Sequence, residues 1–376
     1  MAALSRYHKQ MLFPGIGADG QRHLAQSRIL LVGCGALGCA VADTLVRAGV
    51  GHIRIVDRDF VELTNLQRQV LFDEHDAEEQ LPKVIAAQRR LNRVNSSVVV
   101  EPIIADVDHT NLAEFSSGVS LILDGTDNFE VRYLLNDYSL ESGIPWIFAG
   151  CTGSAGQVMP VFPGESACLR CLMTSPPPPG TTETCDTAGV LGPAIQFVTA
   201  IQSAIAMKVL VGRAQEVERR LHILDVWAGS LRSIDLSGLR SSGTCPACHQ
   251  GERLWLSGSQ RSSSTVLCGR NAVQVTPPEK LQRPLTELAE RLQASGKVSL
   301  NAFLLRVTIP VESTMLNSSP GLSESAADPE IANAASSATD APTAVEMTVF
   351  PDGRAIIRGT SDPVVARTLY ARYIGS

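Results

Sequence analysis

Four cysteines form two C-x-x-C pairs in this chain of 376 residues. The first pair is Cys168 and Cys171, and the second is Cys245 and Cys248. One such pair could be a redox couple or a chance spacing, but two pairs can supply four thiolates to one structural Zn²⁺. The pairs are far apart in the chain, so tertiary folding must bring them together. His249 follows directly, and we expect it to be a bystander because four ligands complete the set.

Three glycines with the spacing G-x-G-x-x-G follow an apolar run, residues 29–32, that is typical of a buried parallel strand. Gly33, Gly35 and Gly38 allow a sharp turn and a close approach of the backbone to a phosphate. A helix predicted over residues 37–48 would aim N–H groups at that phosphate. The pattern predicts a nucleotide-binding βαβ unit, and by itself it fits NAD as well as ATP.

Polar residues follow two further predicted strands at their carboxyl ends, where ligands of open α/β sheets bind. The strand at 53–56 ends in Asp57, which could accept hydrogen bonds from ribose hydroxyls. The strand at 121–124 leads to Asp127, a candidate Mg²⁺ ligand beside substrate phosphates. Asn128 comes next and could be no more than the N-cap of a helix.

The segment between Asp57 and Lys83 is rich in polar side chains. It could be a solvated surface loop, but it leaves the carboxyl end of a parallel strand, which favours a ligand contact. Lys83 follows Pro82 in the first turn of a helix predicted over residues 81–94. A lysine there is unfavourable for the helix dipole, and a phosphate partner would explain it. The polar residues are Asp59, Glu62, Thr64, Asn65, Gln67, Arg68 and Gln69.

The order of these elements predicts an α/β fold with a Rossmann-like, doubly wound and mostly parallel sheet over residues 1–256. Further strands are expected at 97–104 and 145–149, and a final strand at 221–227 would close this domain. A helix at 193–211 is the most apolar stretch of the chain. It contains two glutamines and a lysine, so we expect a core helix rather than a membrane span.

The last third of the chain has a different composition. Residues 257–264 are a polar linker of Gly, Ser, Gln and Arg. We expect a small α+β domain over residues 265–376, with short strands and two helices. An insertion at 312–343 is dominated by small, polar and acidic residues and is predicted to be disordered.

Composition excludes several classes of partner. The 38 acidic against 32 basic residues give a formal charge of -6, and the chain has no Lys/Arg block, so nucleic acid is not expected to bind. The N-terminus lacks the layout of a signal peptide, so nine cysteines favour metal or catalytic roles over disulfides. We therefore expect a cytoplasmic protein without a membrane partner.

A series of motifs runs in order from Arg6 to His249: RYHKQ, GCGALGC, IVDRDFVELTNLQRQ, PKV, DGTDN, CLRC, ETCDTAGVLGP and CPAC. Together they resemble the ThiF/MoeB family of adenylyltransferases, relatives of ubiquitin-activating enzymes that activate the C-terminal glycine of ubiquitin-like sulfur carrier proteins. The resemblance implies ATP, Mg²⁺ and Zn²⁺, a carrier ending in Gly-Gly, a cysteine desulfurase as sulfur donor, and a homodimer. The C-terminal part is similar to an extension of some bacterial ThiF proteins. That favours thiazole synthesis for thiamine over molybdopterin synthesis or tRNA thiolation.

The resemblance also assigns roles at matching positions. The glycine loop would line the ATP phosphates, and Ala36 stands where many members have glycine. Asp57 would hold the ribose, and Asp127 would bind Mg²⁺. The nucleotide-binding set is Gly33, Gly35, Ala36, Gly38, Asp57, Asp59, Asn65, Gln67, Arg68, Lys83, Asp127 and Asn128, of which Arg68, Lys83 and Asp127 are expected to be catalytic.

Two further residues gain a role only from the resemblance. Cys185 could be an inert loop cysteine, but in the family a cysteine at this position forms a covalent link with the C-terminus of the carrier. A loop cysteine near a helix N-terminus can act as a thiolate. Lys9 stands where many members have an arginine that reaches the phosphates of the partner subunit. Lysine keeps that charge but loses the bidentate fork.

The implied reaction is acyl adenylation, in which positioning and charge neutralisation supply most of the catalysis. An NAD-dependent dehydrogenase would share the glycine motif, but it does not explain Arg68, Lys83, Asp127 and the cysteine pairs together. A non-catalytic adaptor would have no need to keep those charged residues.

Overall fold

The computed structural model divides into two compact units, Met1–Arg261 and Ser262–Ser376. The division lies within residues 257–264, the segment expected to be a linker. Cys185 and the whole insertion expected at 312–343 lie outside the described residues, which are 5–177, 188–260, 264–267, 271–277, 283–310 and 344–375.

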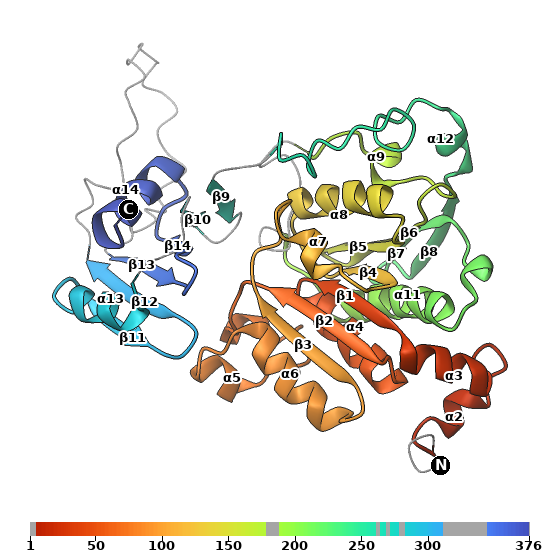
Figure 1. The fold of residues 1–376 in the computed structure, drawn as a ribbon, viewed down its shortest axis with the longest axis horizontal. Coiled ribbons are helices and arrows are strands. Elements are labelled where there is room, and N and C mark those ends of the chain that lie inside the picture. The colour runs from red at the N-terminus through yellow and green to blue at the C-terminus, as the bar shows by residue number, and fades with distance from the viewer. Residues whose placement is uncertain are drawn as a thin grey trace, which may run out of the picture. The chain divides into compact units, whose positions relative to one another are not determined.

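The first unit is built on an eight-stranded sheet with the order β3-β2-β1-β4-β5-β6-β7-β8 (Figure 1). Strands β1 to β5 pair in parallel, and β6, β7 and β8 extend the sheet with antiparallel pairs. The predicted Rossmann-like α/β sheet is confirmed. The strands are β1 Arg28–Val32, β2 His52–Asp57, β3 Val99–Ile104, β4 Leu121–Asp124, β5 Trp146–Thr152, β6 Ala155–Val161, β7 Arg220–Asp225 and β8 Ser230–Asp235.

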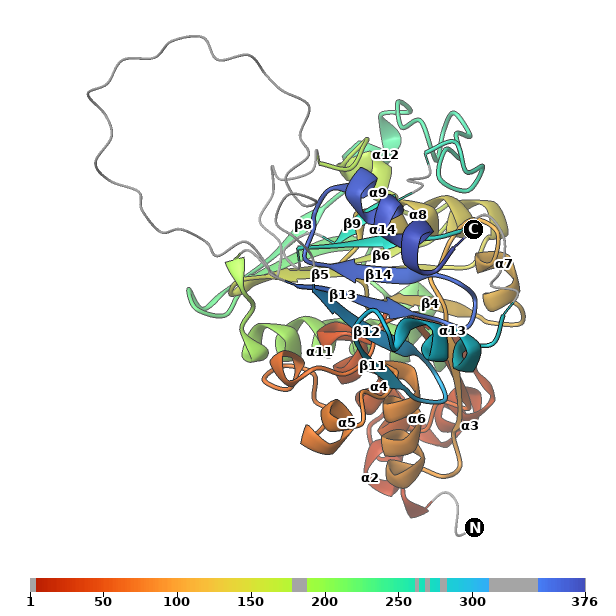
Figure 2. The same cartoon turned by 90° about the vertical axis from the view of Figure 1, so that its left-hand side faces the viewer.

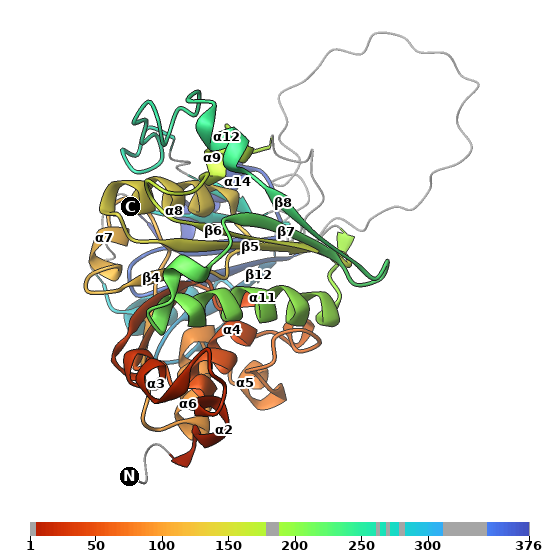
Figure 3. The ribbon, with the colours of Figure 1, turned by 90° about the vertical axis from the view of Figure 1, so that its right-hand side faces the viewer.

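Helices cover both faces of this sheet. Helix α8 (Phe129–Ser142) lies on one face, while α4 (Ala36–Ala48), α6 (Lys83–Val94) and α11 (Gly192–Leu210) lie on the other (Figures 1 and 3). From β1 the chain continues to β2 and β3 on one side, and then returns to the other side of β1 to form β4 and β5. The carboxyl ends of β1, β2 and β4 therefore border the crevice where sheets of this kind bind ligands. The shorter helices are α2 His8–Met11, α3 Gly17–Gln26, α5 Glu74–Glu78, α7 Leu112–Phe115, α9 Leu169–Leu172 and α12 Ser237–Ser241, with 3₁₀ turns η1 Leu63–Asn65 and η2 Ala214–Glu216.

The far edge of the sheet differs from the sequence-based expectation. The strand predicted at 221–227 does not close the unit, because β8 follows it as the edge strand. Five of the six residues of β8 are exposed, so it lacks the apolar run that marks a buried strand. Strand β6 was also not predicted, since a glycine and a proline interrupt its apolar residues.

Among the described residues, only α11 is long and apolar enough to cross a membrane, by length and composition alone. Half of its most apolar window is buried inside the protein. The buried Gln202 donates to the carbonyl oxygens of Asp124, at 2.9 Å, and Ile147, at 3.1 Å. These contacts tie α11 to β4 and β5, as expected for a core helix.

The second unit is a six-stranded antiparallel sheet with the order β11-β12-β13-β14-β10-β9 (Figure 2). Alternate strand residues, among them Val307, Met347 and Ile357, share a core with helices α13 (Leu285–Leu292) and α14 (Pro363–Tyr373). The predicted small α+β domain is confirmed. The strands are β9 Ser264–Leu267, β10 Ala272–Val275, β11 Lys297–Leu300, which was not predicted, β12 Leu305–Pro310, β13 Ala344–Val349 and β14 Ala355–Arg358.

Candidate active site and metal centre

The glycine loop joins β1 to α4 and packs against the segment that follows β4. Gly33 has φ +93°, and a Cβ added there would lie 2.6 Å from the carbonyl oxygen of Gly125. A Cβ on Gly38 would lie 2.1 Å from the carbonyl oxygen of Gly33. At Gly35 the nearest such atom is 3.9 Å away. Packing therefore requires glycine at 33 and 38, whereas Gly35 leaves open space.

That open space lies at the N-terminus of α4. Gly35 is the N-cap of this helix, and no side chain caps it. The first N–H groups of a helix have no partner within the helix, and together with the helix dipole they attract anions. Ala36 is the first residue of α4. The backbone at Gly35 therefore leaves the end of this helix open to an anion.

Asp57 ends β2 beside this loop, and its carboxylate organises the turn. The N–H of Cys34 donates to its Oδ2 at 2.6 Å, and the N–H of Asp59 donates to its Oδ1 at 2.7 Å. Burial raises the pKa of Asp57, although the charge of Lys83 opposes this shift. A carboxylate has about four acceptor positions, so Asp57 can still accept from a ribose hydroxyl.

Lys83 has a protein partner. Its side chain is 3% exposed, and Nζ lies 3.2 Å from Oδ2 of Asp59. The phosphate partner expected for a lysine at the start of α6 stays a prediction, and within the protein the side chain of Lys83 pairs with a carboxylate. The two residues come from the ends of different segments, so the pairing could not be read from their spacing.

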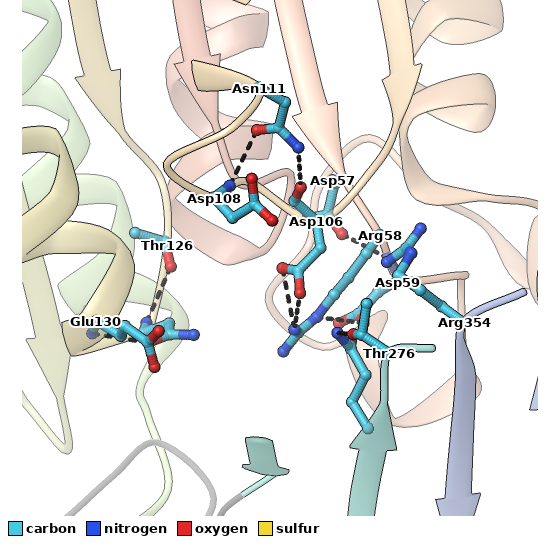
Figure 4. A network of polar contacts seen from close by, with 12 residues as sticks. Asp57, Arg58, Asp59, Asp106, Asp108, Asn111, Thr126, Glu130, Thr276 and Arg354 are labelled. Carbon is cyan, nitrogen blue, oxygen red and sulfur yellow. Dashed lines mark hydrogen bonds and ion pairs between the residues drawn. The ribbon is translucent and has the colours of Figure 1, made fainter. Parts of the chain in front are cut away.

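Arg58, which is not among the predicted site residues, also belongs to this charged group. Its Nη1 donates to both carboxylate oxygens of Asp106 at 3.1 Å, and its Nε lies 3.9 Å from Oδ1 of Asp59 (Figure 4). Burial works to lower the pKa of Arg58, but nearby carboxylates, led by Asp106 and Asp59, outweigh it and raise the pKa. Asn111 donates to the carbonyl oxygen of Asp106 at 2.8 Å and holds that loop. The sequence signal that could have pointed to Arg58 is its position between two aspartates at the end of a predicted strand.

Three predicted residues lie at the end of η1 and just after it, and each has different contacts. Asn65 is buried, and its Oδ1 accepts from the N–H of Glu62 at 3.1 Å, which closes the turn. Nη1 of Arg68 donates to the carbonyl oxygen of Thr64 at 2.9 Å. Gln67 is exposed, and its carbonyl oxygen would lie 3.6 Å from a Cβ on Gly192, at the start of α11.

Asp127 and Asn128 stand between β4 and α8 and have different surroundings. Asn128 is the N-cap of α8, since its Oδ1 accepts from the N–H of Glu130 at 2.9 Å. The N-cap interpretation is confirmed. The N–H of Asn128 donates to Oγ1 of Thr126, which Figure 4 shows beside this helix start. Asp127 is exposed, so its carboxylate is accessible to a cation.

Below this segment lies a buried ion pair that no sequence pattern predicted. Asp124 is fully buried, and Nε of Arg132 donates to its Oδ2 at 3.2 Å. Nη2 of Arg132 donates to the carbonyl oxygens of Thr126, at 2.7 Å, and Ala149, at 3.1 Å. Burial raises the pKa of Asp124 to about 6, and the charge of Arg132 opposes the shift. The one sequence signal for this pair is the position of Arg132, a cation in the first turn of a predicted helix.

The structure brings the four cysteines of the two C-x-x-C pairs together. Their ligand atoms all lie within 4.8 Å of one another. Sγ of Cys168 is 3.6 Å from that of Cys245 and 3.8 Å from that of Cys171, which is 3.4 Å from Sγ of Cys248. Tetrahedral Zn²⁺ with Zn–S bonds of about 2.3 Å requires S–S separations of about 3.8 Å. The thiols therefore fit zinc, and they are too far apart for disulfides.

Surrounding contacts close this cluster. Burial raises the pKa of Cys248 to about 12, so metal binding must displace thiol protons. Nδ1 of His249 lies 3.3 Å from Sγ of Cys248, outside the four-sulfur group. Nη2 of Arg170 donates to Glu252 at 2.8 Å, and the guanidinium lies 5.2 Å from the ring centre of Trp255. These contacts hold the second pair against α9.

The segment after Cys185 is anchored at the same edge of the sheet as the glycine loop. The N–H of Gly153 donates to the carbonyl oxygen of Gly189, and the N–H of Leu191 donates to that of Gly153, both at 2.9 Å. Gly153 lies between β5 and β6, at the carboxyl end of β5. Lys9 is exposed on α2.

Residues 7–247 match the model of the ThiF family. The protein belongs to the ThiF family. The chain is 37% identical over 371 residues to the sulfur carrier protein ThiS adenylyltransferase of Bacillus subtilis, covering 98% of this chain and 99% of that protein. It is 38% identical over 250 residues to the sulfur carrier protein adenylyltransferase of Thermus thermophilus, covering 65% and 90% of the two chains.

Solved structures agree with this family fold. The crystal structure of E. coli MccB with ATP has a TM-score of 0.53 at 24% identity, covering 61% of this chain and 71% of that one. MccB with MccA-N7isoASN gives a TM-score of 0.57 at 22% identity, covering 65% and 74%. At this identity the likeness establishes the fold alone. The sheet and helices of the first unit therefore share the fold of MccB.

Proposed function

We propose that this protein uses ATP to adenylylate the C-terminal glycine carboxylate of a small ubiquitin-like sulfur carrier protein. The observation that carries the proposal is the 37% identity to a ThiS adenylyltransferase, which extends over 98% of this chain and so includes the second unit. A dehydrogenase, the first alternative, gains no support from the family match. Neither does a non-catalytic adaptor.

The proposed chemistry is a displacement at phosphorus. A carboxylate oxygen of the carrier attacks the α-phosphorus of ATP, the bond from that phosphorus to the bridging oxygen of the β-phosphate breaks, and pyrophosphate leaves with the electron pair. A C-terminal carboxylate is already ionised at neutral pH, so no general base is required. Catalysis then depends on aligning the two reactants and offsetting their negative charge.

The residues around the glycine loop suit those two tasks. The open face of Gly35 and the N-terminus of α4 would receive phosphate oxygens, and Asp57 would accept from the ribose. Lys83 is 3% exposed, and a charge removed from water acts more strongly on a nearby phosphate. Arg68 would bring planar donors to the same anion.

Two metals fit the described side chains. Asp127 is an exposed carboxylate beside the proposed phosphate site, and Mg²⁺ is commonly held by one or two carboxylates together with substrate phosphates. Mg²⁺ bound there would offset phosphate charge. Zn²⁺ would be held by Cys168, Cys171, Cys245 and Cys248 in a closed structural site.

The wider roles remain part of the proposal. The carrier would be ThiS-like and serve thiazole synthesis, with a MoeB-type role in molybdopterin synthesis or tRNA thiolation as the alternative. Cys185 would form the covalent link with the carrier, with a cysteine desulfurase as sulfur donor. Lys9 would act across a homodimer, and the protein would work in the cytoplasm.

An ATP–pyrophosphate exchange assay with a purified carrier ending in Gly-Gly tests the proposal. We expect exchange that depends on the carrier and disappears when its terminal glycine is removed. Asp127→Asn should lose most of the activity. Asp19→Asn should retain it, because Asp19 is 80% exposed on α3, where it pairs with Arg22 one turn further along the helix. Absence of exchange, with reduction of a nicotinamide cofactor instead, would reject adenylylation.

A further inference from the structure

The buried Arg132 occupies a position that is unfavourable unless its contacts compensate. It lies in the first turn of α8, where a positive charge opposes the helix dipole. Its side chain is 8% exposed, and a buried charge is costly unless it is paired and fully hydrogen-bonded. Its three acceptors belong to the end of β4, the following turn and β5. The ring centres of Phe129 and Phe148 each lie 5.3 Å from its guanidinium carbon.

These contacts hold the residue directly before Asp127. The carbonyl oxygen of Thr126 accepts from Arg132 at 2.7 Å, and its N–H donates to Oδ1 of Asp124 at 3.0 Å. Both backbone polar groups of Thr126 are therefore fixed by one ion pair. Asp127 is itself exposed, so its place depends on the backbone beside it. The N–H of Gly125 donates to the carbonyl oxygen of Val32 at 2.8 Å, which joins this turn to the glycine loop.

We infer that Arg132 and Asp124 form a positioning pair that holds the Asp127 carboxylate where it can meet Mg²⁺ on the nucleotide. Neither side chain of the pair needs to touch the nucleotide. The inference rests on the proposed function, since it takes ATP as the ligand. Partners of metal ligands act in this way when they fix the orientation of a group that meets the metal.

A second buried arginine supplies a matched control. Arg170 is 4% exposed, pairs with Glu252 at 2.8 Å and lies 5.2 Å from the ring centre of Trp255. It therefore has the same kinds of contact as Arg132, but at the four-cysteine cluster. Replacing either arginine with lysine removes a planar fork and keeps the charge. A general loss of packing affects both variants, while a positioning role affects only Arg132→Lys.

The experiment measures equilibrium binding of a non-hydrolysable ATP analogue over a series of Mg²⁺ concentrations, without carrier, together with Tm. For Arg132→Lys we expect the Mg²⁺ concentration that gives half-maximal binding of the analogue to rise by about tenfold or more. Binding of the analogue without Mg²⁺, in the presence of a chelator, should change little. Arg170→Lys should lower Tm but leave the Mg²⁺ requirement as in the wild type. Asp124→Asn should shift it in the same direction as Arg132→Lys, and the two changes should be less than additive.

An unchanged Mg²⁺ requirement in both Arg132→Lys and Asp124→Asn would overturn the inference and leave the pair a role in folding alone. Should Arg132→Lys not fold, Asp124→Asn, which keeps the side-chain shape, decides the question. The binding assay is independent of the carrier. Failure of carrier-dependent exchange in a protein that still binds Mg²⁺ and ATP therefore rejects the proposed function and not the positioning role.

Discussion

The edge of the sheet at the glycine loop and the four-cysteine cluster both gather ionisable side chains from distant parts of the chain, but they close in different ways. In the cluster, all four sulfurs lie within 4.8 Å of one another, so a bound metal would have no position left for a substrate. At the sheet edge, Asp57 and Lys83 have partners within the protein, while Asp127 is exposed. A metal site with a full set of protein ligands stabilises the fold, whereas a site with an accessible side chain can bind a substrate. The exposure of one ionisable side chain, here Asp127, therefore distinguishes the two kinds of site better than their polarity does.

The largest expected effect comes from opening the closed site. Cys171→Ser should abolish zinc binding and lower the free energy of unfolding by roughly 5 kcal/mol. That is less than the ~10–16 kcal/mol of zinc-finger peptides because the sheet has a core of its own. Metal content by mass spectrometry and denaturant unfolding would measure both. His249→Ala is the control and should keep the metal. A full equivalent of zinc in Cys171→Ser would show that the site is not closed by four thiolates.

A second test addresses the buried pair of Asp124 and Arg132 near the exposed Asp127. Burial raises the pKa of Asp124 from 3.8 to about 6, so the folded protein binds this proton more tightly than the unfolded chain. The resulting stabilisation is fully present below pH 3.8 and is lost as pH rises through about 6. Relative to Asp124→Asn, the free energy of unfolding should fall by about 3 kcal/mol across that window. Urea unfolding at several pH values would measure it, and a flat difference would mean that Arg132 keeps the carboxylate ionised throughout.

Within the glycine loop, we expect Gly38 to be needed for packing and Gly35 for binding of ATP. Gly38→Ala would place a Cβ 2.1 Å from the carbonyl oxygen of Gly33 and should cost about 2 kcal/mol of stability. Gly35→Ala meets no atom closer than 3.9 Å, so its stability should change by less than about 1 kcal/mol while its ATP affinity falls. Unfolding and nucleotide titration of both variants would test this contrast. Wild-type ATP affinity in Gly35→Ala would place the phosphates elsewhere.

The smallest effect is expected at the N-cap of α8. Asn128→Ala removes the bond from the N–H of Glu130 and should cost about 1 kcal/mol. Asn128→Ser can still cap the helix and should be close to the wild type in thermal unfolding. A capping role alone leaves the ATP affinity of both variants unchanged. A tenfold weaker affinity in Asn128→Ser would instead mean a direct contact with the nucleotide.

Sequence patterns predicted the buried parts of the first unit well. Apolar runs such as Ile29–Val32 and Leu121–Leu123 are fully or almost fully buried, and burial on both faces is what makes a run continuous. The edge strand β8 was missed because it pairs through its backbone and leaves its side chains exposed. A strand that buries little carries little periodic signal.

The candidate site was predictable where spacing or a strand end determined it. The two cysteine pairs could be joined because four thiolates match one zinc ion. By contrast, the partner of Lys83 and the pair of Arg132 with Asp124 depend on which strand ends become neighbours in the sheet. No short-range pattern contains that information, so the pairing of Lys83 with Asp59 could not be predicted from the sequence.

The placement of the second cysteine pair has a consequence for the order of events during synthesis. Cys245 and Cys248 follow β8, so the ribosome has made every strand of the first sheet before the fourth sulfur exists. Domains generally fold as units, starting from the N-terminal side, while the chain grows. Zinc would then bind to a first unit whose sheet is almost completely folded. In a cell short of zinc, this unit would accumulate with a folded sheet and an unformed zinc site, rather than as an unfolded chain.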